Sequence, residues 1–539
     1  MTVKEKGAET PFADFDWQIP HRFNFATDVV DRWAEERDGP CLIWEDASGA
    51  RRDFSYDDMS RLTKRVGHAL QAAGISKGDR VLVVLPRIPE WQIAMVAALR
   101  IGAVPIPCIE MLTAAEIRYR ADHSGAQAVI CRAGHADRIE AGLGRVPLRF
   151  SVGPRDGWDD ITAFYDRPDE AEDALVMAED PVLLYYTSGS TGYPKGVLHA
   201  ARGLYAWRYS ARHWLDVRPG DRIWCTADTG WSKAGTSVLF GPWSEGGCAF
   251  MYDGPFDPAE RLSLLARHKI TIYCAPATEL NRVVQEDVAA YDLTALRRTV
   301  SAGEAMNPIV AEQWRAVSGL NVAEAYGQTE TLMTALTVTG IEPRIGSMGI
   351  SAPGSTLSIV DDAGTELPPG EVGHVALKLP NPQFMLGYWN APGALSGAIV
   401  DGPAGRWFLT GDLGSRDAEG YFWYSSRSDD VINSAGYRIG PTEVENAVLE
   451  HGAVLECAVV AAPDPKRGEV VKAFIVLKDG VLGDDTLVKA IQDHVKLVAS
   501  PYKYPRLVDF CSELPKGPTG KILRRALRER EWSRQEPQS

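Results

Sequence analysis

The chain of 539 residues lacks the features that mark disulfide-rich, zinc-binding and membrane-spanning proteins. None of its eight cysteines belongs to a CxxC pair, and most lie in apolar contexts. We therefore expect buried free thiols in a reducing compartment rather than disulfides or a zinc site. No run approaches the ~20 apolar residues that a membrane span needs. The first 20 residues show no recognisable signal or transit peptide, so we expect a cytoplasmic protein.

Basic residues are also in short supply. Lys and Arg number 57 against 72 Asp and Glu, which gives a net charge of −15. An acidic chain without a local basic stripe binds nucleic acid poorly, and its charge does not favour binding to an anionic membrane surface. The length exceeds what one hydrophobic core supports, so we expect at least two domains. We find no internal repeat and no low-complexity segment.

The first two thirds of the chain alternate between strand and helix patterns. Short apolar runs are followed by longer stretches with helical spacing, and Gly or Pro separates them. These patterns predict strands over 81–85, 270–275 and 296–302, and helices over 90–101, 278–289 and 308–318. Such alternation is typical of parallel sheets with helices on their faces, so the fold class is α/β.

The pattern changes after about residue 345, where Gly, Pro and Asp become frequent and short alternating runs predict an antiparallel, barrel-like β subdomain over about 345–428. From about residue 430 strands and helices mix again, which predicts a small α+β domain. We place the boundary at Ser428-Asp429, giving domains of residues 1–428 and 429–539.

Residues 185–196, YYTSGSTGYPKG, follow an apolar run and combine glycines, hydroxyls and one lysine. The spacing is not that of the Walker loop, and Pro194 disfavours a helix starting at Tyr193. Glycines let backbone N–H groups approach an anion, hydroxyls can donate, and Lys195 adds a positive charge. The segment indicates a phosphate cradle, although a surface loop without a ligand is the alternative reading.

Four further segments occur in a fixed order along the chain: YGQTE at 326–330, TGD at 410–412, RSDD with GYRI at 427–439, and TGKI at 519–522. With the glycine-rich segment, they resemble the adenylate-forming superfamily of acyl-CoA synthetases, luciferases and nonribosomal peptide adenylation domains. The segments DTGW, NSAGYRIGPTEVENAV and SPYKYPR are most similar to the medium-chain acyl-CoA synthetases. The resemblance runs from about residue 25 to 530.

The resemblance implies a two-step reaction with ATP, Mg²⁺ and coenzyme A. A carboxylate attacks the α-phosphate of ATP, and the CoA thiol then displaces AMP. It also implies a C-terminal domain that rotates between the steps about a hinge at Asp429. Lys521, Thr329 and Glu330 would be catalytic, and Glu330 would hold Mg²⁺. The ATP site would comprise Thr187, Ser188, Gly189, Ser190, Thr191, Gly192, Lys195, Gly303, Glu304, Tyr326, Gln328, Thr329, Asp412, Arg427 and Arg438.

The remaining implied sites concern the acid and CoA. Gly436, Tyr437 and Lys496 would contact CoA, although Lys496 also fits a plain amphipathic helix. The acyl pocket would be lined by Trp231, Ser232, Lys233, Ala302 and Gly327. Acetyl-specific relatives carry tryptophan at the position of Gly327. Glycine would leave a deeper pocket, favouring C4–C8, branched or aryl acids over acetate, unless it only serves a turn. Lys233 could meet a polar substrate group, CoA phosphates or solvent.

These residues predict an acyl-CoA ligase that acts as a monomer or homodimer on a small carboxylic acid. Three alternatives share part of the pattern. An adenylating enzyme could pass the acyl group to a carrier protein, but no carrier-like segment follows Lys521. A luciferase-like oxygenase shares the same motifs. A nucleotide sensor without turnover would have no need of Lys521.

Overall fold

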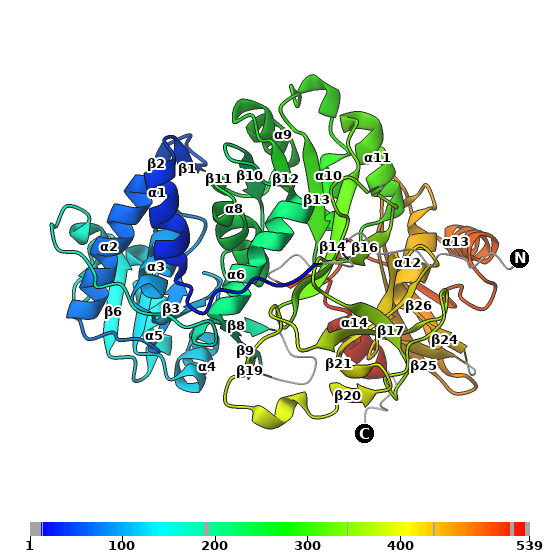
Figure 1. The fold of residues 1–539 in the computed structure, drawn as a ribbon. Helices are drawn as coiled ribbons and strands as arrows, with labels where there is room; N and C mark the ends of the chain where they lie inside the picture. Colours follow the sequence, from blue (N-terminus) through cyan, green and yellow to red (C-terminus); the bar gives the residue numbers. More distant parts are fainter. Residues whose placement is uncertain are drawn as a thin grey trace, which may run out of the picture.

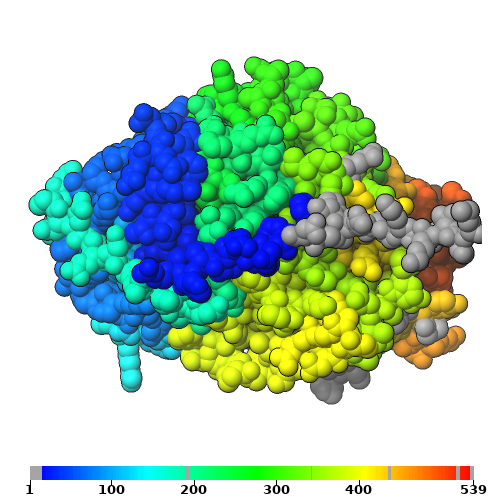
Figure 2. Space-filling view, viewed as in Figure 1, coloured from blue at the N-terminus to red at the C-terminus, as the bar shows by residue number. Residues whose placement is uncertain are grey.

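The computed structural model describes residues 12, 15–187, 193–341, 343–434, 437–517 and 522–533. The described strands form four sheets, three in the large N-terminal part and one near the C-terminus. Figure 1 shows the N-terminal elements at the left, the central helices and strands in green, and the C-terminal elements at the right. Figure 2 shows that these parts pack into one continuous body.

The first sheet is parallel throughout, in the order β4-β3-β5-β6-β7. Helices α2 and α3 pack on one face of this sheet, and α4 and α5 pack on the opposite face (Figure 1). Predicted strand 81–85 and helix 90–101 are confirmed as β3 and α3. The elements are β3 (Arg80–Val84), β4 (Val104–Pro107), β5 (Ala128–Arg132), β6 (Leu148–Val152), β7 (Asp159–Asp160), α1 (Arg32–Glu36), α2 (Tyr56–Ala72), α3 (Pro89–Arg100), α4 (Ala114–Ser124) and α5 (Ala136–Leu143).

The second sheet holds 14 of the described strands and changes character along its length. Its parallel part follows the order β14-β13-β12-β10-β11-β1, with β2 antiparallel at one edge. The parallel strands are β1 (Pro40–Asp46), β10 (Arg222–Cys225), β11 (Cys248–Asp253), β12 (Ile272–Cys274), β13 (Arg298–Ala302) and β14 (Val322–Gln328), and β2 is Arg51–Ser55. The helices around them are α6 (Ala201–Ser210), α7 (Ser232–Ala234), α8 (Phe240–Ser244), α9 (Pro258–Arg267), α10 (Ala277–Val283) and α11 (Pro308–Ser318).

Beyond β14 the same sheet continues with antiparallel strands. They follow the order β15-β16-β22-β21-β18-β17, and β20 pairs with β21. The β-rich region predicted after residue 345 is therefore present, and it extends the central sheet. Its strands are β15 (Leu332–Leu336), β16 (Ser347–Ser351), β17 (Leu357–Val360), β18 (Gly373–Leu379), β20 (Ile399–Gly402), β21 (Gly405–Arg416) and β22 (Phe422–Arg427).

The third sheet is a short antiparallel unit in the order β19-β9-β8. Strands β8 (Pro181–Thr187) and β9 (Lys195–Ala200) pair from Pro181↔Ala200 to Thr187↔Lys195. Strand β19 (Gly387–Tyr388) adds to β9. This sheet places Lys195 and Tyr388, which are far apart in sequence, on adjacent strands.

The fourth sheet follows the order β24-β23-β26-β25, with β27 paired to β26. Strand β22 ends at Arg427 and β23 begins at Ile432, so the proposed boundary at Ser428-Asp429 falls between two sheets. The elements are β23 (Ile432–Ser434), β24 (Tyr437–Ile439), α12 (Pro441–Leu449), β25 (Val454–Asp464), β26 (Gly468–Leu477), α13 (Asp485–Val498), β27 (Leu507–Phe510) and α14 (Arg524–Ser533).

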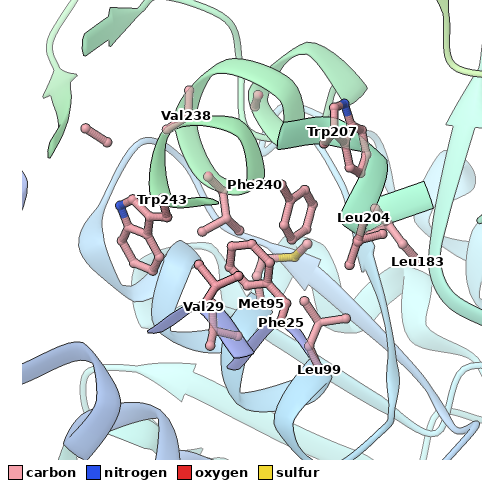
Figure 3. Close-up of a cluster of buried hydrophobic side chains, with 14 of the residues drawn as sticks. Phe25, Val29, Met95, Leu99, Leu183, Leu204, Trp207, Val238, Phe240 and Trp243 are labelled. Atoms are coloured by element: carbon pink, nitrogen blue, oxygen red, sulfur yellow. The ribbon is translucent and has the colours of Figure 1, made fainter. Parts of the chain in front are cut away.

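Helix α3 lies in the main hydrophobic core. All twelve of its residues are buried, which fits its near-continuous apolar sequence. Figure 3 shows Met95 and Leu99 of α3 beside Phe25, Trp207 and Phe240, so side chains from distant segments meet here. This packing joins the first sheet to the central one.

Two other sequence expectations have clear outcomes. Seven cysteines are buried and Cys511 is half-buried, and all eight are free, as expected. The helix predicted over 278–289 is wrong in length: α10 covers Ala277–Val283, and a short 3₁₀ turn follows at Val288–Ala290. Among the described residues, no helix has the length and apolar character needed to cross a membrane.

Candidate active site

The predicted site residues gather at the carboxyl ends of the parallel strands in the central sheet. Strand β13 ends at Ala302, and Gly303 and Glu304 follow directly. Strand β14 ends at Gln328, and Thr329 and Glu330 follow. In open α/β sheets ligands bind outside the carboxyl ends of the strands, so the fold brings these motifs to the expected edge.

Asp412 is the centre of a buried polar cluster. Its side chain is 6% exposed. Its Oδ2 accepts hydrogen bonds from Tyr326 Oη at 2.6 Å and from Gln328 Nε2 at 2.7 Å. Arg427 Nη1 donates to Oδ1 at 3.1 Å, because Asp412 and Arg427 are cross-strand partners on β21 and β22. Four residues predicted to bind ATP therefore make one connected cluster.

Burial and charge act in opposite directions on this carboxylate. Burial outweighs the opposing effects of Arg427 and the two hydrogen bonds, so the pKa of Asp412 is raised from its ordinary value. For Arg427 burial lowers the pKa, but the carboxylates of Asp412 and Asp429, with the nearby phenols, together outweigh burial and the pKa is raised. The donors around Asp412 therefore offset part of the cost of burying its carboxylate.

Thr329 is held from two sides. Its hydroxyl lies 3.0 Å from the hydroxyl of Ser232, and its backbone carbonyl accepts from Nε2 of His199 at 2.7 Å. Burial lowers the pKa of His199 to about 4, so its ring is neutral and carries its proton on Nε2. His199 on β9 therefore fixes the backbone of the motif, and Ser232 orients its hydroxyl.

Glu330 connects the central sheet to the third sheet. Its Oε1 accepts a hydrogen bond from Tyr388 Oη at 2.9 Å, and Lys195 Nζ lies 4.9 Å from the centre of the Tyr388 ring. The carboxylate and burial together raise the pKa of Tyr388, so this phenol stays protonated and donates. The described residues bring no three metal-ligating side chains together. A single carboxylate such as that of Glu330 would suit Mg²⁺, which keeps waters and phosphate oxygens as its other ligands.

The turn after β13 holds Gly303 and Glu304, and it is fixed by a glycine conformation and by a hydrogen bond to α10. Gly303 has φ of +98°, a conformation that favours glycine, and it lets the chain reverse directly after the strand. The carboxylate of Glu304 accepts from the backbone N–H of Thr278 at the start of α10, at 2.8 Å. This bond ties the turn to α10.

Lys233 points back to the sheet edge. Its Nζ donates to the carbonyl of Ala302 at 2.8 Å, so two predicted pocket residues are in direct contact. Of the three interpretations left open from sequence, the described conformation favours neither a CoA phosphate nor bulk solvent. Trp231 packs partly buried against the core of the first sheet, and its indole Nε1 is buried with no hydrogen-bond partner among the described residues.

Gly327 lies where two stretches of backbone approach closely, which supports the alternative from the sequence that this glycine serves the backbone. A Cβ placed there would lie 1.9 Å from the carbonyl oxygen of Leu332 and 2.8 Å from the Cα of Met333. Strands β14 and β15 shift register between Tyr326 and Gly327, which brings the two backbones together. A tryptophan at this position therefore needs a backbone change, so the residue type alone does not measure pocket depth.

Of the predicted CoA contacts, Tyr437 lies on β24 of the fourth sheet and Lys496 on α13. Tyr437 stacks on Tyr502 with ring centres 4.4 Å apart. Lys496 pairs with Asp493 at 2.8 Å and also lies over the ring of Tyr504 at 4.4 Å. Lys496 is thus an ordinary helix-surface lysine in this conformation, beside an aromatic group.

The predicted hinge residue is held between both parts of the chain. The carboxylate of Asp429 lies 3.5 Å from Nε of Arg427, and its backbone carbonyl accepts from Arg528 of α14 at 2.9 Å. Ser188, Gly189, Ser190, Thr191, Gly192, Gly436 and Lys521 lie outside the described residues, as does the side chain of Arg438.

Sequence reasoning missed Tyr388 and His199. Tyr388 sits in a Gly-Tyr-Trp run whose aromatic pair is a weak signal, and its partner Glu330 is 58 residues away. His199 gave no signal at all, because a single histidine in an apolar strand reads as core. Only the pairing of β9 with β19 and its approach to β14 bring them to the site.

Comparison with known proteins shows the family to which the chain belongs. A family model described as "AMP-binding enzyme" matches residues 30–389, and one described as "AMP-binding enzyme C-terminal domain" matches residues 443–521. The chain is 40% identical to the mitochondrial acyl-coenzyme A synthetase ACSM3 of Mus musculus over 96% of this chain and 92% of that protein.

Two solved structures are similar over nearly their whole length. One is the anthranilate CoA ligase AuaEII in complex with anthranoyl-AMP, with a TM-score of 0.86, 29% identity and coverage of 97% of this chain and 99% of that chain. The other is a benzoate CoA ligase from Burkholderia xenovorans LB400, with a TM-score of 0.83, 27% identity and coverage of 94% and 100%.

The chain therefore belongs to the AMP-binding enzyme family, within the adenylate-forming superfamily. It is an AMP-forming acyl-CoA synthetase, an acid–thiol ligase that uses ATP, Mg²⁺, coenzyme A and a carboxylic acid. The mouse relative is described as mitochondrial, so the cytoplasmic location expected from the sequence stays a prediction.

Proposed function

We propose that this ligase activates a short-to-medium-chain, branched or aryl acid in preference to acetate. The observation that carries the proposal is the junction of Ser232, Thr329 and Lys233 with the sheet edge at Ala302. Here the predicted acyl pocket meets the motif that would hold the α-phosphate. Similarity to the anthranilate and benzoate CoA ligases supports an aryl acid as the substrate, and similarity to the acyl-coenzyme A synthetase ACSM3 supports an acid that yields an acyl-CoA.

The Asp412 cluster suits the ribose of ATP. A carboxylate offers about four acceptor sites, and three are engaged by Tyr326, Gln328 and Arg427. A ribose hydroxyl would donate to the remaining site or take the place of Arg427, which would then turn toward phosphate. Gly303 and Glu304 would line the adenine.

Thr329, Glu330 and Lys195 would manage the phosphates. The hydroxyl of Thr329, oriented by Ser232, would donate to an α-phosphate oxygen. Bound Mg²⁺, held through Glu330, would neutralise charge on the phosphates. Lys521 would follow the charge that develops as the acid carboxylate attacks, with pyrophosphate leaving. The thiol of CoA would then attack the acyl carbon and release AMP.

The first experiment measures AMP formation from ATP and Mg²⁺ with acetate, butyrate, hexanoate, octanoate and benzoate, each with and without CoA. The proposal expects CoA-dependent turnover with at least one acid larger than acetate and little with acetate. Turnover that favours acetate would overturn the substrate class. Pyrophosphate release that ignores CoA would point to another acceptor, such as a carrier protein.

A further inference from the structure

The strongest unassigned feature is an ion cluster between the large part and the C-terminal domain. Glu456 on β25 is 13% exposed and faces two cations. Its Oε1 lies 3.1 Å from Arg282 Nη2, which belongs to α10 of the large part. Lys516 Nζ, within the C-terminal domain, lies 2.8 Å from its Oε2. One largely buried carboxylate is therefore shared between the two domains.

The contact has a second, uncharged component. Asn281, next to Arg282 on α10, places its side-chain amide 3.5 Å from the backbone carbonyl of Leu455. Two adjacent residues of α10 thus meet two adjacent residues of β25. Strand β25 shifts register between Val454 and Glu456, which turns this segment away from regular pairing with β26 and toward α10.

Lys516 stands at the base of the segment that carries the catalytic lysine. It forms an isolated antiparallel bridge with Ile522, so the two ends of residues 517–521 are joined. Lys521 lies outside the described residues, but it directly precedes Ile522 in sequence. A constraint on Lys516 therefore also reaches Ile522, the residue directly after Lys521.

We propose that Glu456, through Arg282 and Lys516, is a positioning residue that docks the described ends of the Lys521 segment, Lys516 and Ile522, against α10 for the adenylation half-reaction. This rests on the proposed role of Lys521 in the ligase. Because α10 also receives Glu304 at its first turn, the same helix would connect the nucleotide turn to the docked segment. A rotated C-terminal domain would separate Glu456 from Arg282 while leaving Lys516 with Glu456, so the contact with Arg282 belongs to one arrangement of the domains.

The test measures the two half-reactions separately in Arg282→Ala and Glu456→Gln, using the acid that gives the most AMP in the panel above. Adenylation is followed by ATP–pyrophosphate exchange, and thioester formation from supplied acyl-adenylate and CoA. We expect kcat of adenylation to fall about fivefold, the scale of a partly buried ion pair. The KM for ATP and the thioester step should stay unchanged. The double variant should lose less than the product of the single losses.

Arg51→Ala is the matched control, because Arg51 pairs with Asp53 in an exposed hairpin remote from the domain contact. It should leave both half-reactions unchanged. Equal loss of both half-reactions in Glu456→Gln, together with a lower melting temperature, would mean a general structural role and would overturn the proposal. A rise in KM for ATP alone would overturn it as well.

Hydrogen exchange separates this proposal from the proposed function. In the substrate-free protein, Glu456→Gln and Arg282→Ala should speed amide exchange in residues 277–284 and 453–457, whether or not any acid is turned over. Unchanged exchange in both segments would refute the docking contact. If both variants show faster exchange but the wild type forms no AMP with any acid, the docking contact stands and the proposed function is refuted instead.

Discussion

Asp412→Asn tests the buried cluster at the nucleotide site. The carboxylate accepts two hydrogen bonds on Oδ2 and one from Arg427 on Oδ1. The carboxamide of Asn can keep its oxygen toward Tyr326 and Gln328, but its NH₂ group then faces the guanidinium. One charge-assisted bond is lost, which is worth ~1.5–3 kcal/mol. Arg427 is 41% exposed and can turn to water, so the penalty of a fully buried unpaired charge does not apply.

We therefore expect Asp412→Asn to lower the free energy of unfolding by ~2 kcal/mol and to raise the KM for ATP by at least about tenfold. Urea unfolding and ATP–pyrophosphate exchange measure the two effects. Asp401→Asn is the control, because Asp401 and Arg406 are also cross-strand partners, at 3.1 Å, but are 79% and 61% exposed. Its unfolding free energy should change by less than ~0.5 kcal/mol. If the two variants behave alike, burial is not what makes the Asp412 cluster matter.

Three further predictions address pH, backbone and catalysis. Burial raises the pKa of Glu324 to about 8 although two backbone amides donate to it, so its folded-state pKa lies above the unfolded value. Its stabilising contribution is complete below about pH 4.5 and is lost as the pH rises through about 8. The free energy of unfolding, measured with urea from pH 5 to 9, should therefore decline less steeply in Glu324→Gln than in the wild type. Parallel pH profiles of the two proteins would contradict this. Gly327→Ala should cost ~2 kcal/mol or more through the clash with backbone, whereas Gly134→Ala, where nothing lies within 4 Å, should be near neutral by thermal unfolding. Lys521→Ala should reduce adenylation by ~10²-fold or more and spare thioester formation from supplied acyl-adenylate, and an equal loss in both assays would exclude its role.

The sequence predicted the regular elements well where local pattern and packing agree. Strand β3 and helices α3 and α11 lie within a residue of the predicted ranges, because apolar runs ended by Gly or Pro leave little choice. Helix α10 is shorter than predicted because the chain after Val284 turns through residues 285–290 before it reaches β13. Propensity alone does not register such a turn.

The site divides in the same way. Its motifs indicated the family, because Thr329, Glu330, Asp412 and Lys521 belong to short segments that occur in the order typical of that family. Tertiary structure decided what those motifs touch. His199 and Tyr388 reach Thr329 and Glu330 only because β9 and β19 pair across a gap of nearly 190 residues.

Gly327 and Lys233 show why the acid itself was not determined. From the sequence, Gly327 indicated an open pocket, and Lys233 was left with three possible partners. In the fold, the backbone of Leu332 lies too close to Gly327 for a side chain, and Lys233 donates a hydrogen bond to the carbonyl of Ala302. Motifs specify chemistry because a phosphate or a ribose demands particular donors at particular spacing. The shape left over for an acid is set by backbone paths that meet from distant parts of the chain, and no local pattern records it.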